Sequence, residues 1–171
     1  MYVRAFAKIY NPTMAVEVIK ELKKTYPKAI ICMIGPDKDG TLDDVLQLIN
    51  TYKLQDSIEI TGVLSKEEWH EKSEDFDIFI NTTNVDNTPI SVIESMALGL
   101  PIVSTNVGGL PYLIENNRDG ILVDKNNAIA MSMRIIEIVD KNSISLAKKA
   151  RIKAEFFDWS SVRNQWLNIL K

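Results

Sequence analysis

The chain has 171 residues, of which 46% are hydrophobic and 25% charged, so one globular domain is expected and a disordered chain is excluded. A net charge of −3 disfavours a nucleic-acid partner but allows a small anionic ligand, which needs only a few local donors. No apolar stretch reaches the ~18–20 residues that span a bilayer, and residues 1–8 lack a signal-peptide layout, so the chain is expected to be cytoplasmic.

Short apolar runs alternate with stretches of helical periodicity along most of the chain. The runs are rich in branched residues and end at turn formers, as buried parallel strands do; they lie at 29–34, 57–60, 76–80, 101–104 and 120–123. Helical periodicity covers 15–22, 42–54, 67–72, 90–98 and 128–139. This alternation predicts an α/β fold, a single Rossmann-like domain with a parallel sheet of about six strands and helices on both faces.

Two further helical stretches, 143–157 and 159–170, follow Val123 with no strand between or after them. Asp158 or Ser160 is expected to cap the second of these helices, because short polar side chains accept hydrogen bonds from a first helical turn. The predicted domain therefore ends in two helices.

The single cysteine and the single histidine are weak candidates for chemistry. Cys32 falls in an apolar run and is expected to be buried in a strand, whereas His70 lies in a polar helical stretch and is expected at the surface. One thiol and one imidazole cannot form a zinc cluster, a Cys–His dyad or an intramolecular disulfide. A reducing compartment and no metal site are expected.

Small or polar residues follow each predicted strand. These residues are Gly35, Gly62, residues 81–83 and Thr105. In open α/β sheets the ligand crevice lies beyond the carboxyl ends of the strands, so these loops are expected to converge on one cleft.

The segment 81–101 contains the strongest indication of a ligand site. Thr88 is placed to cap a helix that begins at Pro89, and a helix N-terminus offers free N–H groups to a phosphate. Ser91 adds a hydroxyl in the first turn. Glu94 lies three residues later on the same face, where a carboxylate can accept two hydrogen bonds from a vicinal diol such as ribose. The spacing alone also fits a solvated glutamate favoured by the helix dipole.

The stretch from Asp86 to Gly109 resembles the signature of retaining glycosyltransferases of the GT-B type, specifically family 4 (group 1). That signature has two acidic residues eight positions apart, a helix with small residues, a Gly-x-Pro turn, a strand and a Gly-Gly loop. The matching residues are Asp86, Glu94, Ala97, Gly99, Pro101, Ile102-Val103-Ser104-Thr105 and Gly108-Gly109. Supporting matches elsewhere are Tyr26-Pro27, Gly35, Ile60-Thr61-Gly62, Asp77-Ile78 and Phe157-Asp158-Trp159, so the resemblance covers nearly all of the chain.

This resemblance implies a site for the nucleotide part of a sugar donor. Glu94 would hold the ribose hydroxyls, and Ser91 with the backbone near Thr88, Pro89 and Ile90 would hold the diphosphate. Gly35 and Gly62 would let the chain approach the nucleotide closely. No cofactor or metal is implied, because the helix dipole and cationic side chains can neutralise the diphosphate.

The resemblance also implies the residues nearest the chemistry. Arg4, at the end of the first strand, would stabilise the charge on the leaving phosphate, and Asp86 would lie beside the donor sugar. The family usually has Glu where this chain has Asp86, one methylene shorter. Lys8 follows Arg4 by four residues and precedes Tyr10 rather than a Lys-Gly pair, so it either supplies the second positive charge or is an exposed lysine.

GT-B enzymes have two Rossmann-like domains, and residues 1–171 resemble only the C-terminal, donor-binding one. The acceptor-binding N-terminal domain would then be a missing partner, and the isolated domain is expected to bind nucleotide weakly and to be inactive alone. Assembly of a polysaccharide or a lipid-linked glycan is the family's commonest use, which leaves peripheral membrane association of the full enzyme open.

Three other classes fit the sequence less well. A non-catalytic interaction domain of the receiver type needs an acidic cluster after the first strand, where this chain has Arg4 and Lys8. A GT-B sugar-nucleotide epimerase or phosphorylase domain is disfavoured by the lack of a histidine-rich loop or a cofactor-anchoring lysine motif. A dinucleotide-binding oxidoreductase needs G-x-G-x-x-G after the first strand, but residues 35–40 follow the second strand with different glycine spacing.

Overall fold

The computed structural model describes residues 1–170, apart from the side chain of Asn164. The strands in this part of the chain are β1 (Tyr2–Val3), β2 (Ile31–Ile34), β3 (Ile58–Gly62), β4 (Phe79–Asn81), β5 (Ile102–Thr105) and β6 (Ile121–Val123). The helices are α1 (Pro12–Leu22), α2 (Thr41–Tyr52), α3 (Lys66–Lys72), α4 (Ile90–Ala97), α5 (Leu110–Leu113), α6 (Ala128–Asp140), α7 (Ile144–Glu155) and α8 (Trp159–Ile169). Two 3₁₀ turns, η1 (Lys8–Tyr10) and η2 (Ser73–Asp75), complete the elements.

The strands form two parallel three-stranded sheets, ordered β1-β2-β3 and β4-β5-β6. Backbone hydrogen bonds join their edges: the Met1 amino group donates to Ile78 O at 2.7 Å, and Ile80 N donates to Met1 O at 2.9 Å. Across both sheets the strand order is therefore 3-2-1-4-5-6, which is the order of the Rossmann fold. The predicted parallel α/β architecture is confirmed, and the strand order reverses between β1 and β4.

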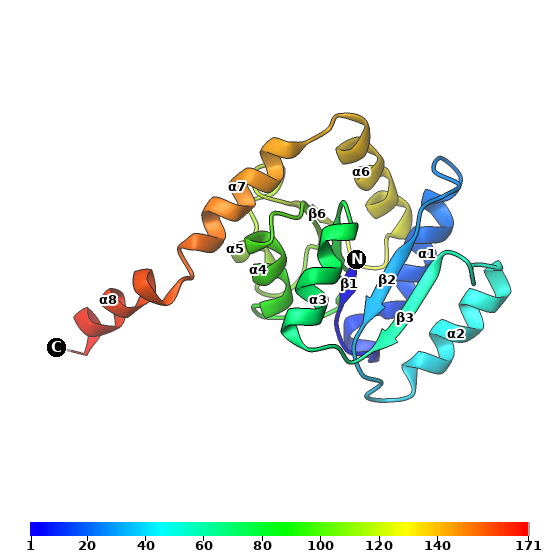
Figure 1. The fold of residues 1–171 in the computed structure, drawn as a ribbon, viewed down its shortest axis with the longest axis horizontal. Coiled ribbons are helices and arrows are strands. Elements are labelled where there is room, and N and C mark those ends of the chain that lie inside the picture. The colour runs from blue at the N-terminus through cyan, green and yellow to red at the C-terminus, as the bar shows by residue number, and fades with distance from the viewer. Residues whose placement is uncertain (171) are drawn as a thin grey trace.

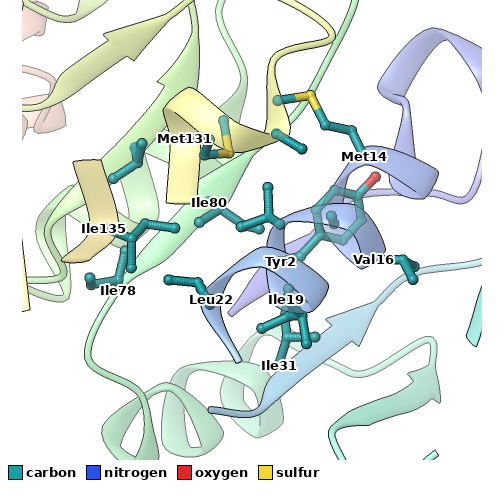
Figure 2. Close-up of a cluster of buried hydrophobic side chains, with 14 of the residues drawn as sticks. Tyr2, Met14, Val16, Ile19, Leu22, Ile31, Ile78, Ile80, Met131 and Ile135 are labelled. Carbon is teal, nitrogen blue, oxygen red and sulfur yellow. The ribbon is translucent and has the colours of Figure 1, made fainter. Parts of the chain in front are cut away.

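Helices cover both faces of this sheet (Figure 1). Side chains of α1, α2 and α6 pack on one face, and those of α3, α4 and α5 pack on the other. α7 contributes Leu146 to the first cluster and Ala150 and Ala154 to the second. Successive strand residues alternate between the two clusters, as Ile31 and Met33 do against Cys32 and Ile34. Figure 2 shows α1 and α6 meeting β1, β2 and β4 in the first cluster, around Tyr2.

Cys32 is fully buried in β2, as predicted, and burial raises the pKa of its thiol to about 11. His70 lies on α3 with its ring edge-on to the buried Trp69. The sequence did not predict the short α5 or the two 3₁₀ turns, because runs of three or four residues show no periodicity.

The two C-terminal helices are present as predicted. Asp158 caps α8, accepting a hydrogen bond from Ser160 N at 2.8 Å. α8 extends away from the sheet and its helices (Figure 1), with large apolar side chains such as Trp159 and Trp166 exposed. No helix within residues 1–170 is both long enough and apolar enough to cross a membrane.

Candidate functional site

The strands that flank the reversal of strand order, β1 and β4, are followed by the residues singled out in the sequence. Arg4 and Lys8 follow β1, whereas Asp86 and the start of α4 follow β4. Ligands of open α/β sheets bind beyond the carboxyl ends of the strands at such a reversal. The candidate site is therefore built from two segments that lie far apart in sequence: Arg4 and Asp86 are separated by 82 positions.

Polar side chains after β4 fix the turn after β1. Thr82 Oγ1 donates to the carbonyls of Tyr10 and Asn11, at 3.1 and 2.8 Å. Thr83 Oγ1 and Asn84 N both donate to Ile9 O, at 3.2 and 2.8 Å. The carbonyls of Ile9, Tyr10 and Asn11 thus accept hydrogen bonds from the segment after β4, and the turn that includes Lys8 is held against that segment.

Arg4 and Asp86 form an ion pair at the centre of this region. Arg4 Nη2 donates to Asp86 Oδ2, and only 17% and 12% of the two side chains are exposed. The other carboxylate oxygen, Asp86 Oδ1, accepts from Asn87 N at 2.8 Å. The Arg4 guanidinium also lies 4.1 Å from the centre of the Tyr10 ring, a cation–π contact.

The Gly-Gly loop after β5 supports the segment that carries Asp86. Gly109 N donates to Asp86 O at 2.9 Å. A Cβ on Gly108 would overlap Asp86 O, and a Cβ on Gly109 would overlap Asn87 O. Gly108 also has φ of +54°, a conformation that favours glycine. These two positions need glycine because two loops pass in direct backbone contact.

The start of α4 differs from the prediction by one residue. Pro89 is the N-cap, with extended backbone (ψ 118°), and α4 begins at Ile90, so the assignment of Thr88 as N-cap and Pro89 as first helical residue was wrong. Proline is compatible with the cap because it needs no hydrogen-bond acceptor for a missing N–H. Thr88 is exposed and provides no side-chain cap.

The first turn of α4 offers the donors that the sequence predicted. Val92 N is hydrogen-bonded to Pro89 O at 3.1 Å, whereas the N–H groups of Ile90 and Ser91 meet no acceptor within residues 1–170. Ser91 is 8% exposed, and its hydroxyl has no hydrogen-bond partner in the described part of the chain. An orphaned buried hydroxyl beside free helix N–H groups provides the donors that a phosphate requires.

Glu94 lies one turn further along α4 and contacts Lys66, which the sequence did not predict as part of the site. Lys66 Nζ lies 2.6 Å from Glu94 Oε1, and the two side chains are 66% and 21% exposed. This hydrogen bond and the glutamate charge raise the pKa of Lys66. Lys66 is the first residue of α3, whose start is fixed by a capping box between Ser65 and Glu68. The Ser65-x-x-Glu68 spacing could have marked this helix start in the sequence.

The glycines at the ends of β2 and β3 lie beside each other, since Gly35 N donates to Gly62 O at 2.8 Å. A Cβ on Gly35 would overlap Arg4 O, so packing against the Arg4 backbone already requires glycine there. Gly62 has φ of +73° and open space where a Cβ would lie. Close approach of these glycines to a nucleotide stays a prediction.

Lys8 lies on the exposed turn η1, in the same loop after β1 as Arg4. Its backbone N donates to Asp39 Oδ2 at 3.0 Å, and hydrogen bonds to Thr41 and Lys8 lower the pKa of Asp39. Within residues 1–170, no three His, Cys, Asp or Glu side chains lie close enough to hold a metal ion.

The strand order and the α4 N-terminus at its reversal define a Rossmann-like α/β domain with backbone donors that are unpaired among the described residues, beyond the carboxyl ends of its strands. The family model of glycosyl transferases group 1 matches residues 1–155, and the chain belongs to this family.

Its curated relatives include glycosyltransferases named for the biosynthesis of colanic acid and of amylovoran. The chain is 31% identical over 134 residues to the putative colanic acid biosynthesis glycosyltransferase WcaL of Salmonella typhimurium, covering 72% of this chain and 33% of the relative. It is 29% identical over 113 residues to the amylovoran biosynthesis glycosyltransferase AmsK of Erwinia amylovora, covering 60% of this chain and 28% of the relative. The chain thus spans about a third of the length of these relatives.

Solved structures show the same fold. Anabaena HepE in complex with UDP superposes with a TM-score of 0.86 at 17% identity, covering 99% of this chain and 48% of HepE. The C-terminal domain of the group 1 glycosyltransferase LpcC from Francisella tularensis gives 0.80 at 17% identity, covering 90% of this chain and 83% of that domain.

Proposed function

We propose that residues 1–171 form the donor-binding domain of a retaining glycosyltransferase that uses a nucleoside-diphosphate sugar. The observation that carries this proposal is the set of groups that the structure brings together beyond the carboxyl ends of β1 and β4. The cation Arg4 adjoins the segment before α4, the free N–H groups and orphaned Ser91 hydroxyl follow, and the Glu94 carboxylate lies one turn beyond. The phosphates of a nucleotide bind cations and N–H or O–H donors, and its ribose hydroxyls can donate to a carboxylate, so these groups match a nucleotide from phosphate to ribose.

The diphosphate would be held at the α4 N-terminus. The N–H groups of Ile90 and Ser91 and the Ser91 hydroxyl would donate to its oxygens, helped by the positive end of the helix dipole. Glu94 would accept the two ribose hydroxyls. Because Lys66 contacts only Oε1 of Glu94, the second carboxylate oxygen can take a hydroxyl without breaking that contact.

Sugar transfer leaves negative charge on the nucleoside diphosphate as the glycosidic bond breaks. Arg4 would stabilise that charge, and Lys8 would add a second cation from its exposed turn. These cations and the helix dipole make a metal unnecessary for neutralising the diphosphate. Asp86 would reach the donor sugar through the lone pairs that Arg4 and Asn87 leave free.

The whole protein would transfer a sugar to a glycan or a lipid-linked acceptor in the cytoplasm. The relatives named for colanic acid and amylovoran biosynthesis support a glycan product. The acceptor site would belong to an N-terminal domain that is not part of these 171 residues. The isolated domain would then bind nucleotide without turning it over, because no second wall closes the crevice. UDP is the first nucleotide to test, since HepE holds UDP and UDP-glucose in its solved structures.

Calorimetric titration of the 171-residue chain with UDP, GDP and ADP tests the proposal. One nucleotide should bind, and Glu94→Ala should weaken it by about 1–3 kcal/mol, the usual cost of leaving polar groups without partners. Absence of binding by all three up to millimolar concentration would refute the donor site and favour a non-catalytic interaction domain.

The phosphate contact has its own test. Arg4→Ala should weaken the nucleoside diphosphate more than the nucleoside, because only the diphosphate carries the charge that Arg4 meets. Equal weakening of UDP and uridine would remove Arg4 from the phosphate role.

A further inference from the structure

The Arg4 guanidinium is held on two sides by other residues. Asp86 accepts a hydrogen bond from its Nη2, and Arg4 Cζ lies over the Tyr10 ring, 4.1 Å from the ring centre. Arg4 Nε is buried and has no hydrogen-bond partner within residues 1–170. A guanidinium has five N–H donors, so Nη donors other than the one bound to Asp86 stay available to an anion.

Tyr10 is itself fixed in place by the residues around it. Its backbone N donates to Ala7 O at 2.8 Å, and its carbonyl accepts from the fully buried Thr82 hydroxyl. Asn11, next in the chain, has a left-handed backbone and ends the turn. The ring therefore presents its face to Arg4 from a turn whose backbone is held by hydrogen bonds, and an aromatic face within about 6 Å attracts a guanidinium.

We propose that Tyr10 is a positioning residue for Arg4, which orients the guanidinium plane so that its free edge faces the diphosphate. The inference rests on the proposed function for the identity of the ligand, but the contact itself is independent of it. Tyr10 acts through Arg4 and touches no reacting atom. Asp86 fixes one end of the guanidinium, whereas the ring fixes its plane.

Two variants separate this role from simple packing. Tyr10→Phe keeps the aromatic face and removes only the phenol oxygen, whereas Tyr10→Leu fills similar space without a π system. Tyr52→Leu is a matched control, because the Tyr52 ring holds Lys20 at 3.9 Å in another cation–π pair, formed between α1 and α2 away from the site.

Binding of UDP and uridine by these variants gives the first readout. Tyr10→Leu should weaken UDP about fivefold, as expected for the loss of one cation–π contact, and should leave uridine within about twofold. Tyr10→Phe and Tyr52→Leu should bind both ligands as the unchanged chain does. Equal weakening of UDP and uridine by Tyr10→Leu, or no weakening of UDP, would overturn the proposal.

A ligand-free measurement keeps the inference testable if the nucleotide proposal fails. In the ¹H–¹⁵N spectrum, the Arg4 Nε–Hε signal, assigned by its loss in Arg4→Lys, should be shifted by the ring current and slow to exchange. Both properties should persist in Tyr10→Phe and disappear in Tyr10→Leu. An Arg4 signal unchanged in Tyr10→Leu would contradict the proposal whatever the chain binds, whereas failure of the unchanged chain to bind any nucleotide would refute the proposed function alone.

Discussion

The two acidic residues eight positions apart, Asp86 and Glu94, meet basic side chains in different surroundings. The Arg4–Asp86 pair is mostly buried, and its members are also engaged by Tyr10, Asn87 and the Gly-Gly loop. The Lys66–Glu94 pair joins an exposed lysine to one oxygen of a half-buried carboxylate. Asp86 thus belongs to a mostly buried ion pair, whereas the ion pair of Glu94 is one that a ligand can readily share.

Because of this difference, the two ion pairs should contribute differently to the stability of the fold and to nucleotide binding. Breaking a buried pair leaves a charge without a partner in a poorly solvated place, whereas an exposed pair contributes little because water and salt replace it. Changes at the first pair should therefore affect folding as well as nucleotide binding. Changes at the second pair should affect binding alone.

The largest effect is expected where the Asp86 segment crosses the Gly-Gly loop. Gly109→Ala places a Cβ on Asn87 O and must push the two loops apart, which we expect to destabilise the fold by about 2–4 kcal/mol. Urea denaturation measures this change. Gly40→Ala is the control, because Gly40 has a positive φ, unlike Gly109, but open space around a Cβ, so about 1 kcal/mol is expected from backbone strain alone. Equal costs at the two glycines would mean that the loop contact is unimportant.

Asp86→Ala should be next in size. The mostly buried Arg4 loses its only carboxylate partner within residues 1–170, and the expected loss of stability is about 2–3 kcal/mol. Chemical denaturation at low and high salt checks it, since a buried pair is screened weakly. A loss that vanishes in 1 M salt would show instead that the pair behaves as a surface pair.

Thr82→Val should cost less, about 1–2 kcal/mol, because it keeps the shape of the side chain but removes the donor to Tyr10 O and Asn11 O. The same variant should loosen the turn that carries Tyr10, which faster amide exchange of residues 8–11 would reveal. Slow exchange there despite the lost hydroxyl would assign the turn's rigidity to Thr83 and Asn84.

Lys66→Gln should have the smallest effect on folding. The unfolding midpoint should not change measurably, because the lysine is exposed. Nucleotide affinity should change only modestly, and the change should shrink as salt increases. A large loss of stability in Lys66→Gln would contradict the contrast between the two pairs.

Most of the fold could be predicted from the sequence, because β2 to β6 are short branched runs closed by turn formers and the long helices repeat an apolar face. β1 has only two residues, Tyr2 and Val3, and was indicated by the resemblance rather than by such a run. The buried Cys32 and the Asp158 cap followed from the same local rules. The start of α4 was predicted one residue too early, because Thr88 is a favourable cap by residue type but its side chain caps nothing in the structure.

The site was predicted less completely, because its contacts join distant segments. Resemblance indicated Arg4, Asp86 and Glu94, but not that Arg4 and Asp86 are paired. Lys66 reaches Glu94 across 28 positions, and the Thr82 hydroxyl reaches Tyr10 across 72. No periodicity or spacing carries such information. The roles of the site residues toward a ligand stay predictions.

The central claim is that Glu94 holds a ribose diol, and one calorimetric comparison tests it most directly. The affinities of UDP and of 2′,3′-dideoxy-UDP are measured for the unchanged chain and for Glu94→Ala. The unchanged chain should lose about tenfold or more in affinity when the diol is removed, whereas Glu94→Ala should lose almost nothing further, since the partner is already gone. Equal losses in the two proteins, or equal binding of both nucleotides by the unchanged chain, would contradict the account.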